Sequence, residues 1–243
     1  MDVADTTAKK ELREQLPSDE DGDSTIAYLK AVQRRIARIT GDSPGSLGVH
    51  PVVYFYTRSG TFQPTAFLAI SNVLESLATR KKLNDFTRVR EGFESFLVAR
   101  KEAMSLLIHK FGSGGRSLPW LQVYYDRILE GLWSGKSAVD IQSAFANDLN
   151  FTFLTVPRPS GVREASAKTK HAFSSGTKTA AFFAAALPNG TRCGVCGGLV
   201  HKNSVHFDHK IPVRDGGAGD MSNAQVAHPY CDSTYKDWRA ATI

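Results

Sequence analysis

Apolar residues recur every three or four positions along the first two thirds of the chain, a spacing that predicts amphipathic helices. A first helix is expected from Ser24, capped by Asp23 or by Ser24 itself, with an apolar stripe at Leu29, Val32, Ile36 and Ile39. Further stripes predict helices over residues 67–77, over 86–111 as a single helix of about seven turns, over 121–132 and over 138–149. Residues 24–156 are therefore expected to form a mostly helical domain.

Two stretches depart from this helical period. The segment VHPVVYFYT, residues 49–57, is short and rich in β-branched and aromatic side chains, so a buried strand is expected there. The loop FGSGGRS, residues 111–117, contains glycines and a cation, but it lacks the spacing of a phosphate-binding loop and lies between two predicted helices. A turn that ends a helix is favoured there over a phosphate site.

Composition sets two further segments apart. Residues 1–23 hold three Lys/Arg against eight Asp/Glu and few apolar side chains, which predicts a disordered acidic leader. Residues 157–178 hold five Lys/Arg against one Glu, and a short helical pattern follows, so residues 157–189 are expected to be a basic linker with a short helix. The linker cations either contact a phosphate backbone or belong to a solvated connector.

The overall charge points towards a polyanionic partner. The formal net charge is +6, and because residues 1–23 contribute −5, residues 24–243 carry +11, which suits DNA. No run reaches the roughly eighteen apolar residues of a membrane span, and the N-terminus is too polar for a secretory signal. We therefore expect no membrane association and a location in the cytoplasm.

All three cysteines lie in the last fifth of the chain, where they form two pairs of metal-ligand type. Cys193-Gly-Val-Cys196 and His228-Pro-Tyr-Cys231 are separated by 31 residues. Two such pairs predict a tetrahedral structural zinc site. A redox Cys-x-x-Cys motif is the less favoured alternative, because it gives no reason for the distant His-x-x-Cys pair. Zinc would also explain how residues 190–243, too few for a core of their own, form a stable module.

The segment between the two pairs combines an extended stretch, SVHFDHKIPV, with a turn, DGGAGD. Asp208 and His209 are neighbours, so on a strand their side chains would point to opposite faces. The order C-G-V-C, D-H-K-I-P-V, G-G and N-A-Q-V-A-H-P-Y-C-D resembles the HNH endonucleases, also called His-Me finger or ββα-metal nucleases. This resemblance implies an α+β protein in which a mostly helical N-terminal domain precedes a small zinc-stabilised, treble-clef-like HNH module.

The resemblance also implies roles for individual residues. His209 would be the general base, and Asp208 and Asp232 would hold a catalytic Mg²⁺ or Mn²⁺. Asp232 stands where the family often has His or Asn. Asn223 would brace the loop between the strands or orient His209. His228 is either the fourth zinc ligand, as we prefer, or a catalytic partner.

Several residues around this motif have two open interpretations. Four cations would grip DNA phosphates or lie on an ordinary solvated surface: Lys210, Arg214, Lys236 and Arg239. His206 precedes Asp208 by two residues, so it would share that face of a strand, either supporting the metal site or as a bystander.

Together with the motifs, this resemblance implies a metal-dependent DNA endonuclease that acts in restriction or antiviral defence. The alternative is a noncatalytic zinc-stabilised DNA-binding module with a decayed nuclease site. The helical domain would then position DNA or bind a protein partner or a second copy of the chain. A weaker resemblance is to the HNH portion of bacterial restriction-type proteins that also carry a ParB-like domain, although residues 1–156 show no such domain.

Overall fold

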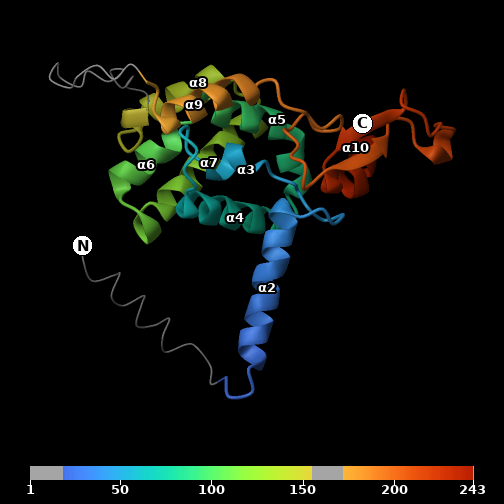
Figure 1. Ribbon diagram of the computed structural model, residues 1–243, viewed down its shortest axis with the longest axis horizontal. Coiled ribbons are helices and arrows are strands. Elements are labelled where there is room, and N and C mark those ends of the chain that lie inside the picture. The colour runs from blue at the N-terminus through green and yellow to red at the C-terminus, as the bar shows by residue number, and fades with distance from the viewer. Residues whose placement is uncertain (1–18, 155–171, 243) are drawn as a thin grey trace. The chain divides into compact units, whose positions relative to one another are not determined.

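The computed structural model describes residues 19–154 and 172–242 (Figure 1). Residues 1–18 of the predicted acidic leader and residues 157–171 of the predicted basic linker lie outside these residues. The chain divides into two compact units, residues 1–36 and residues 37–243. Among the described helices, none combines the length and the apolarity needed to cross a membrane.

Helix α2 (Asp23–Thr40) confirms the first predicted helix. The carboxylate of Asp19 accepts hydrogen bonds from the backbone N–H groups of Ser24 and Thr25, so Asp19 caps the first turn in place of the expected Asp23 or Ser24. Ile39, the last residue of the predicted stripe, is buried in the larger unit.

The larger unit has a helical core, and its helices are α3 (Pro51–Phe55), α4 (Pro64–Thr79), α5 (Leu83–Ala99), α6 (Ala103–Phe111), α7 (Leu118–Trp133), α8 (Ala138–Ala146) and α9 (Ser175–Ala186). Helix α7 packs against both α4 and α5. Their buried side chains, among them Ile70, Phe86, Phe93 and Tyr125, form one apolar cluster. This is the mostly helical arrangement that the sequence predicts.

The strand predicted over residues 49–57 is wrong, because most of this segment is helix α3. Pro51 occupies the first turn, where its fixed φ angle suits a helix and its missing N–H costs no hydrogen bond. Val53, Tyr54 and Phe55 are all buried. The apolar run therefore indicates a buried segment, and a short helix can be buried as well as a strand can.

The single long helix predicted over residues 86–111 is also wrong, because the chain breaks between α5 and α6. Arg100 leaves the helical conformation with φ −123° and ψ 44°. At the break Lys101 turns inward and its ammonium donates hydrogen bonds to the backbone carbonyls of Val52 and Val53 in α3. Burial lowers the pKa of Lys101 to about 7. Because the helix breaks here, Lys101 can donate to carbonyl groups that the short helix α3 leaves without a partner within the helix.

The predicted helix-ending turn at residues 111–117 is present. Gly112 follows α6 with a φ of +90°, a conformation that favours glycine, and a short 3₁₀ turn, η1 (Gly114–Arg116), leads into α7. The helix predicted over residues 138–149 is α8, which ends at Ala146, and Leu149 lies beyond it and is exposed.

The C-terminal part contains a two-stranded antiparallel sheet followed by a helix. Strand β1 (His206–His209) pairs with β2 (Ala224–Ala227), so that Phe207 faces Val226 and His209 faces Ala224. A π-helical turn, η4 (Cys231–Tyr235), and then α10 (Lys236–Thr242) complete the chain. The mostly helical body with this small hairpin confirms the predicted α+β class.

A buried ion pair within helix α5 also contacts the loop that follows Cys193 and Cys196. Arg90 and Glu94 are both fully buried, with Arg90 Nε 2.7 Å from Glu94 Oε1. The second carboxylate oxygen of Glu94 accepts a hydrogen bond from the backbone N–H of Leu199. A Cβ atom at Gly198 would lie 2.8 Å from the Arg90 side chain, so glycine permits this close approach.

The Glu94→Gln substitution should lower the free energy of unfolding by about 3 kcal/mol, because it leaves the Arg90 charge buried without its counter-ion. Urea denaturation followed by circular dichroism measures this effect. Glu91→Gln is a suitable control, because Glu91 lies on the same helix and is exposed. A Glu94→Gln protein as stable as the Glu91→Gln protein would contradict the assigned role of the ion pair.

Candidate functional site

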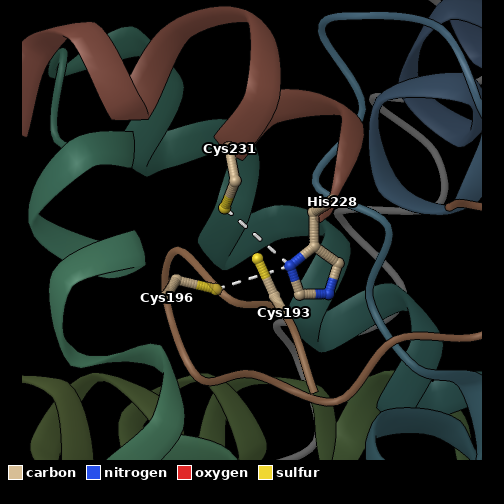
Figure 2. Close-up of side chains that lie close together, drawn as sticks. All are labelled: Cys193, Cys196, His228 and Cys231. Carbon is tan, nitrogen blue, oxygen red and sulfur yellow. Dashed lines mark hydrogen bonds between the residues drawn. The ribbon is translucent and has the colours of Figure 1, made fainter. Parts of the chain in front are cut away.

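The four predicted zinc ligands come together in one buried cluster (Figure 2). The ligand atoms of Cys193, Cys196, His228 and Cys231 all lie within 4.8 Å of one another. Nδ1 of His228 is 3.4 Å from Sγ of Cys196 and 3.8 Å from Sγ of Cys231. Among the described residues, this is the only such group of three or more potential ligands.

The spacing of these atoms fits a zinc ion. Zn–S bonds of about 2.3 Å and Zn–N bonds of about 2.0 Å in a tetrahedron place sulfur and nitrogen about 3.5 Å apart, between the two separations found here. Nε2 of His228 lies 3.1 Å from the carbonyl oxygen of Leu199, to which it can donate, leaving Nδ1 free to bind a metal. The cluster therefore supports zinc binding, with His228 positioned as the fourth ligand.

Local structure on both sides of the cluster explains how the ligands converge. The N–H of Cys193 donates to Gly198 O at 2.8 Å, and the N–H of Gly197 donates back to Cys193 O at 2.9 Å, which folds the first pair into a tight knuckle. Gly197 has a φ of +72°, which a residue with a side chain adopts only under strain. Helix begins again at Pro229, so Cys231 lies on its first turn.

The three thiols influence one another strongly. Hydrogen bonding from Cys196 and Cys231 lowers the pKa of Cys193, and the contact with Cys193 raises the pKa of Cys231. Crowded thiols cannot all ionise without a cation between them. A bound metal supplies that cation, which agrees with the geometry above.

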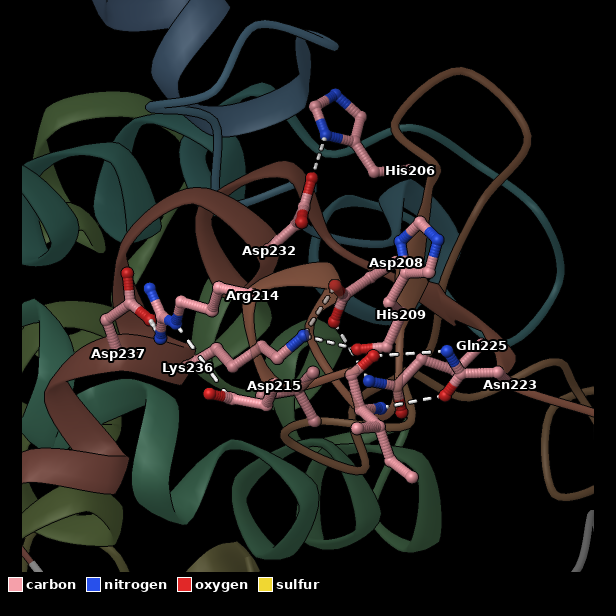
Figure 3. A network of polar contacts seen from close by, with 12 residues as sticks. His206, Asp208, His209, Arg214, Asp215, Asn223, Gln225, Asp232, Lys236 and Asp237 are labelled. Carbon is pink, nitrogen blue, oxygen red and sulfur yellow. Dashed lines mark hydrogen bonds and ion pairs between the residues drawn. The ribbon is translucent and has the colours of Figure 1, made fainter. Parts of the chain in front are cut away.

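Asp208 lies on the inner face of β1 and is almost completely buried. Its Oδ1 accepts a hydrogen bond from Lys236 Nζ at 2.6 Å, and its Oδ2 accepts one from Gln225 Nε2 at 2.9 Å (Figure 3). Lys236 also donates to the backbone carbonyl of His209. The cation predicted to grip DNA phosphate is therefore paired with the predicted metal ligand.

Asp232 has a different partner, His206. Nδ1 of His206 is 2.8 Å from Asp232 Oδ2, and Nε2 of the same ring is 2.8 Å from the carbonyl oxygen of Asp42. Both ring nitrogens thus face acceptors, an arrangement that only the imidazolium form satisfies. Hydrogen bonding to Asp232 accordingly raises the pKa of His206. The i, i+2 spacing to Asp208 was the sequence signal for His206, but it could not reveal Asp232 as the partner.

The π-helical turn η4 sets the direction of the side chains between the two sites. The N–H of Lys236 donates to the carbonyl of Cys231, five residues earlier, as a π-turn requires. This wide turn brings residues five positions apart to nearly the same side of the helix. Of these two residues, Cys231 belongs to the Cys3His cluster and Lys236 donates to Asp208. The sequence pattern did not predict this turn.

Asn223 braces the loop between the two strands. Its Oδ1 accepts from the N–H of Ile211 at 2.8 Å, and its Nδ2 donates to the carbonyls of Ile211 at 3.1 Å and Ala218 at 2.7 Å. A Cβ atom at Gly217 would lie 1.8 Å from the Ile211 carbonyl oxygen, so only glycine fits beneath the brace. Of the two predicted roles, these contacts match the brace and not the orientation of His209.

His209 ends strand β1 on the face opposite Asp208 and is half-buried. In the part of the chain that the structure describes, its imidazole makes no hydrogen bond, and Figure 3 shows only its backbone carbonyl in the network. The ring is thus available to a ligand from outside the protein.

The three remaining predicted phosphate contacts also have partners within the chain. Lys210 donates to the carbonyl of Ser222 at 2.7 Å, and Arg239 donates to that of Val195 at 2.7 Å. Arg214 forms an exposed ion pair of 2.9 Å with Asp237. The structure therefore does not gather these cations into an unpaired basic patch.

Two carboxylates of the C-terminal module have the oxygen donors that a hard divalent cation prefers. Oxygen donors of Asp208 and Asp232 suit Mg²⁺ or Mn²⁺. Lys236 and Gln225 occupy both oxygens of Asp208, whereas the Asp232 side chain is one-third exposed and hydrogen-bonds to His206. Binding between the two aspartates would require the Lys236 contact to open.

Comparison with known proteins agrees with the site. Residues 193–237 match the model of the HNH endonuclease family. Searches of curated proteins and of solved structures each gave no significant match. The matched segment begins at the first zinc-type cysteine, includes the Asp208–His209 pair and ends in α10. The C-terminal part of this chain thus matches the HNH endonuclease family, and the match together with the Cys3His cluster suggests a nuclease or DNA-binding role with a metal site.

Proposed function

We propose that this protein is a metal-dependent DNA endonuclease in which His209 is the general base. The observation that carries the proposal is the imidazole of His209, which lies at the end of β1 without a hydrogen-bond partner among the described residues. A neutral imidazole has one unprotonated ring nitrogen, which can take a proton from a water molecule that attacks phosphorus.

The rest of the module positions this base. The Cys3His cluster anchors both ends of the hairpin segment, and Asn223 fixes the loop that follows His209. Asp208 and Asp232 would hold a single Mg²⁺ or Mn²⁺. Such an ion, when bound, offsets negative charge on the scissile phosphate and on the leaving oxygen. His206, bonded to Asp232, keeps that carboxylate in place.

DNA is the proposed substrate because the HNH match and the charge of the chain agree. Residues 24–243 carry a net +11, which favours a polyanion. Cleavage of foreign DNA, in restriction or antiviral defence, is the setting we propose. The helical core would position DNA or contact a protein partner or a second copy of the chain.

A plasmid relaxation assay tests the proposal. Supercoiled DNA should be nicked when Mn²⁺ or Mg²⁺ is added to the zinc-loaded protein, and it should stay supercoiled without added ion. The Asp232→Ala protein should lose at least about 100-fold in nicking rate, because one of two proposed ligands is removed. Metal-independent nicking, or full activity in Asp232→Ala, would refute this assignment of the ion site.

One observation favours a second candidate, a noncatalytic DNA-binding module. Both oxygens of Asp208 already have protein donors, and Lys236 supplies a positive charge beside them. In that case the protein should bind DNA with strong dependence on salt, yet should nick no plasmid at any concentration of divalent ion. The same assay, run beside a binding titration, separates the two candidates.

A further inference from the structure

The HNH module exposes four large apolar side chains close to His209 in sequence. The exposed fractions are 77% for Phe207, 56% for Ile211, 67% for Val213 and 94% for Met221. Exposed apolar residues that occur singly need no explanation, but one that lies on the same strand face as a proposed catalytic group is a candidate for contact with a ligand. Phe207 is the largest of the four and has the most defined position, because it lies on a strand.

Phe207 and His209 point to the same face of β1. Side chains alternate along a strand, so residues 207 and 209 share one face, and His206 and Asp208 share the other. Positions two apart are about 6.6 Å from each other along a strand. Across the sheet, Phe207 faces Val226 and His209 faces Ala224, so no large side chain of β2 covers the ring. A phosphate at His209 would therefore have the Phe207 ring as a close neighbour.

The charges of the module leave little unpaired positive surface for phosphates. Residues 190–243 hold six Lys/Arg against five Asp/Glu, a net charge of +1. Lys236, Arg214, Lys210 and Arg239 each bond to a group within the chain. Contact with nucleic acid at this face thus depends on apolar surface more than on ion pairing.

We propose that Phe207 stacks on an unpaired base next to the scissile phosphate, so that the substrate is single-stranded or locally unpaired DNA. This inference rests on the proposed function, which places a phosphate at His209. An aromatic ring can stack on any of the four bases, since each has a flat π face. In an intact duplex those faces are buried between neighbouring base pairs, and an exposed ring reaches them only where the stack opens.

Fluorescence anisotropy with the full, zinc-loaded chain tests this proposal. Three labelled probes of equal length would be compared, namely a single strand, a perfect duplex and a duplex with an unpaired bulge, all without added divalent ion so that no cleavage occurs. The parent protein should bind the single strand and the bulge about tenfold more tightly than the duplex.

Variants at Phe207 assign the preference to the ring. Phe207→Ala should weaken binding to the single strand and the bulge by about tenfold and change duplex binding by less than about twofold. Phe207→Trp, which keeps an aromatic face, should retain the preference of the parent. Phe182→Ala is the matched control, because Phe182 is 68% exposed but lies on α9. Zinc content, measured on each protein, verifies that the module is folded.

The possible outcomes separate this inference from the proposed function. Equal affinity of the parent and Phe207→Ala for every probe, or an equal loss on duplex and single strand, overturns the stacking proposal while DNA binding stands. Failure of the parent to bind any probe overturns both, and it would leave a protein partner as the occupant of the Phe207 face.

Discussion

Replacing His209 with alanine should slow plasmid nicking by about 10²–10⁴-fold, the usual contribution of a general base. The imidazole contacts no other described residue through its nitrogens, so its removal should leave the fold unchanged. Zinc content and the urea unfolding midpoint of the variant should match those of the parent. The loss would then belong to the chemical step alone.

A matched histidine substitution controls for changes unrelated to catalysis. His109 lies on α6 in the helical core and is exposed, so His109→Ala should nick at the parent's rate. If His209→Ala nicks plasmid as fast as His109→Ala, the general base has been assigned to the wrong residue.

The Cys3His cluster could be predicted from the sequence because each of its two pairs is local. Cys193 with Cys196 and His228 with Cys231 have the spacing typical of zinc ligands, and the structure brings all four side chains together. The roles of Asp208, His209 and Asn223 stay predictions, which were made from the order of these residues within a known motif. None of these inferences required knowledge of how the elements pack.

The contacts that depend on packing could not be predicted. Pairing of Lys236 with Asp208, and of His206 with Asp232, follows from the placement of a strand beside a π-turn. Such a turn has no reliable sequence signal, and it changes which side chains face the sheet. For the same reason, the sequence could not predict that the four cations expected at a DNA surface bond to groups within the protein.

In the helical core, the periodicity predicted that helices are present better than it predicted where they end or which apolar segments are strands. The wrong assignment over residues 49–57 arose because apolar composition marks burial and does not distinguish a short helix from a strand. The break at Arg100 depends on Lys101 reaching carbonyls 48 and 49 residues away in the sequence, a contact that no local pattern encodes.

Substituting Cys231 with serine should remove the zinc ion and unfold the C-terminal module while the helical core remains folded. A serine hydroxyl is a poor zinc ligand, and zinc binding contributes on the order of 10 kcal/mol to small domains of this kind. The apolar cluster around the site contains only small or medium side chains apart from Tyr235, and three of its seven members are the cysteines themselves. Besides the proposed metal, the N–H of Gly194 links the knuckle to β2 by donating to the carbonyl of Val226 at 2.8 Å, a contact that we expect to be too weak to hold the module folded alone.

Elemental analysis and hydrogen exchange measure this loss. The parent should contain about one zinc ion per chain and Cys231→Ser almost none, and amide protection should disappear from the β1–β2 pair and persist in α4 and α7. Ser233→Ala, two residues away and exposed, should keep both the ion and the protection. Because the Leu199 N–H bonded to Glu94 lies in the same knuckle, protection in α5 near Glu94 should also weaken. Retention of zinc and hairpin protection in Cys231→Ser would mean that a metal ion does not hold this module together.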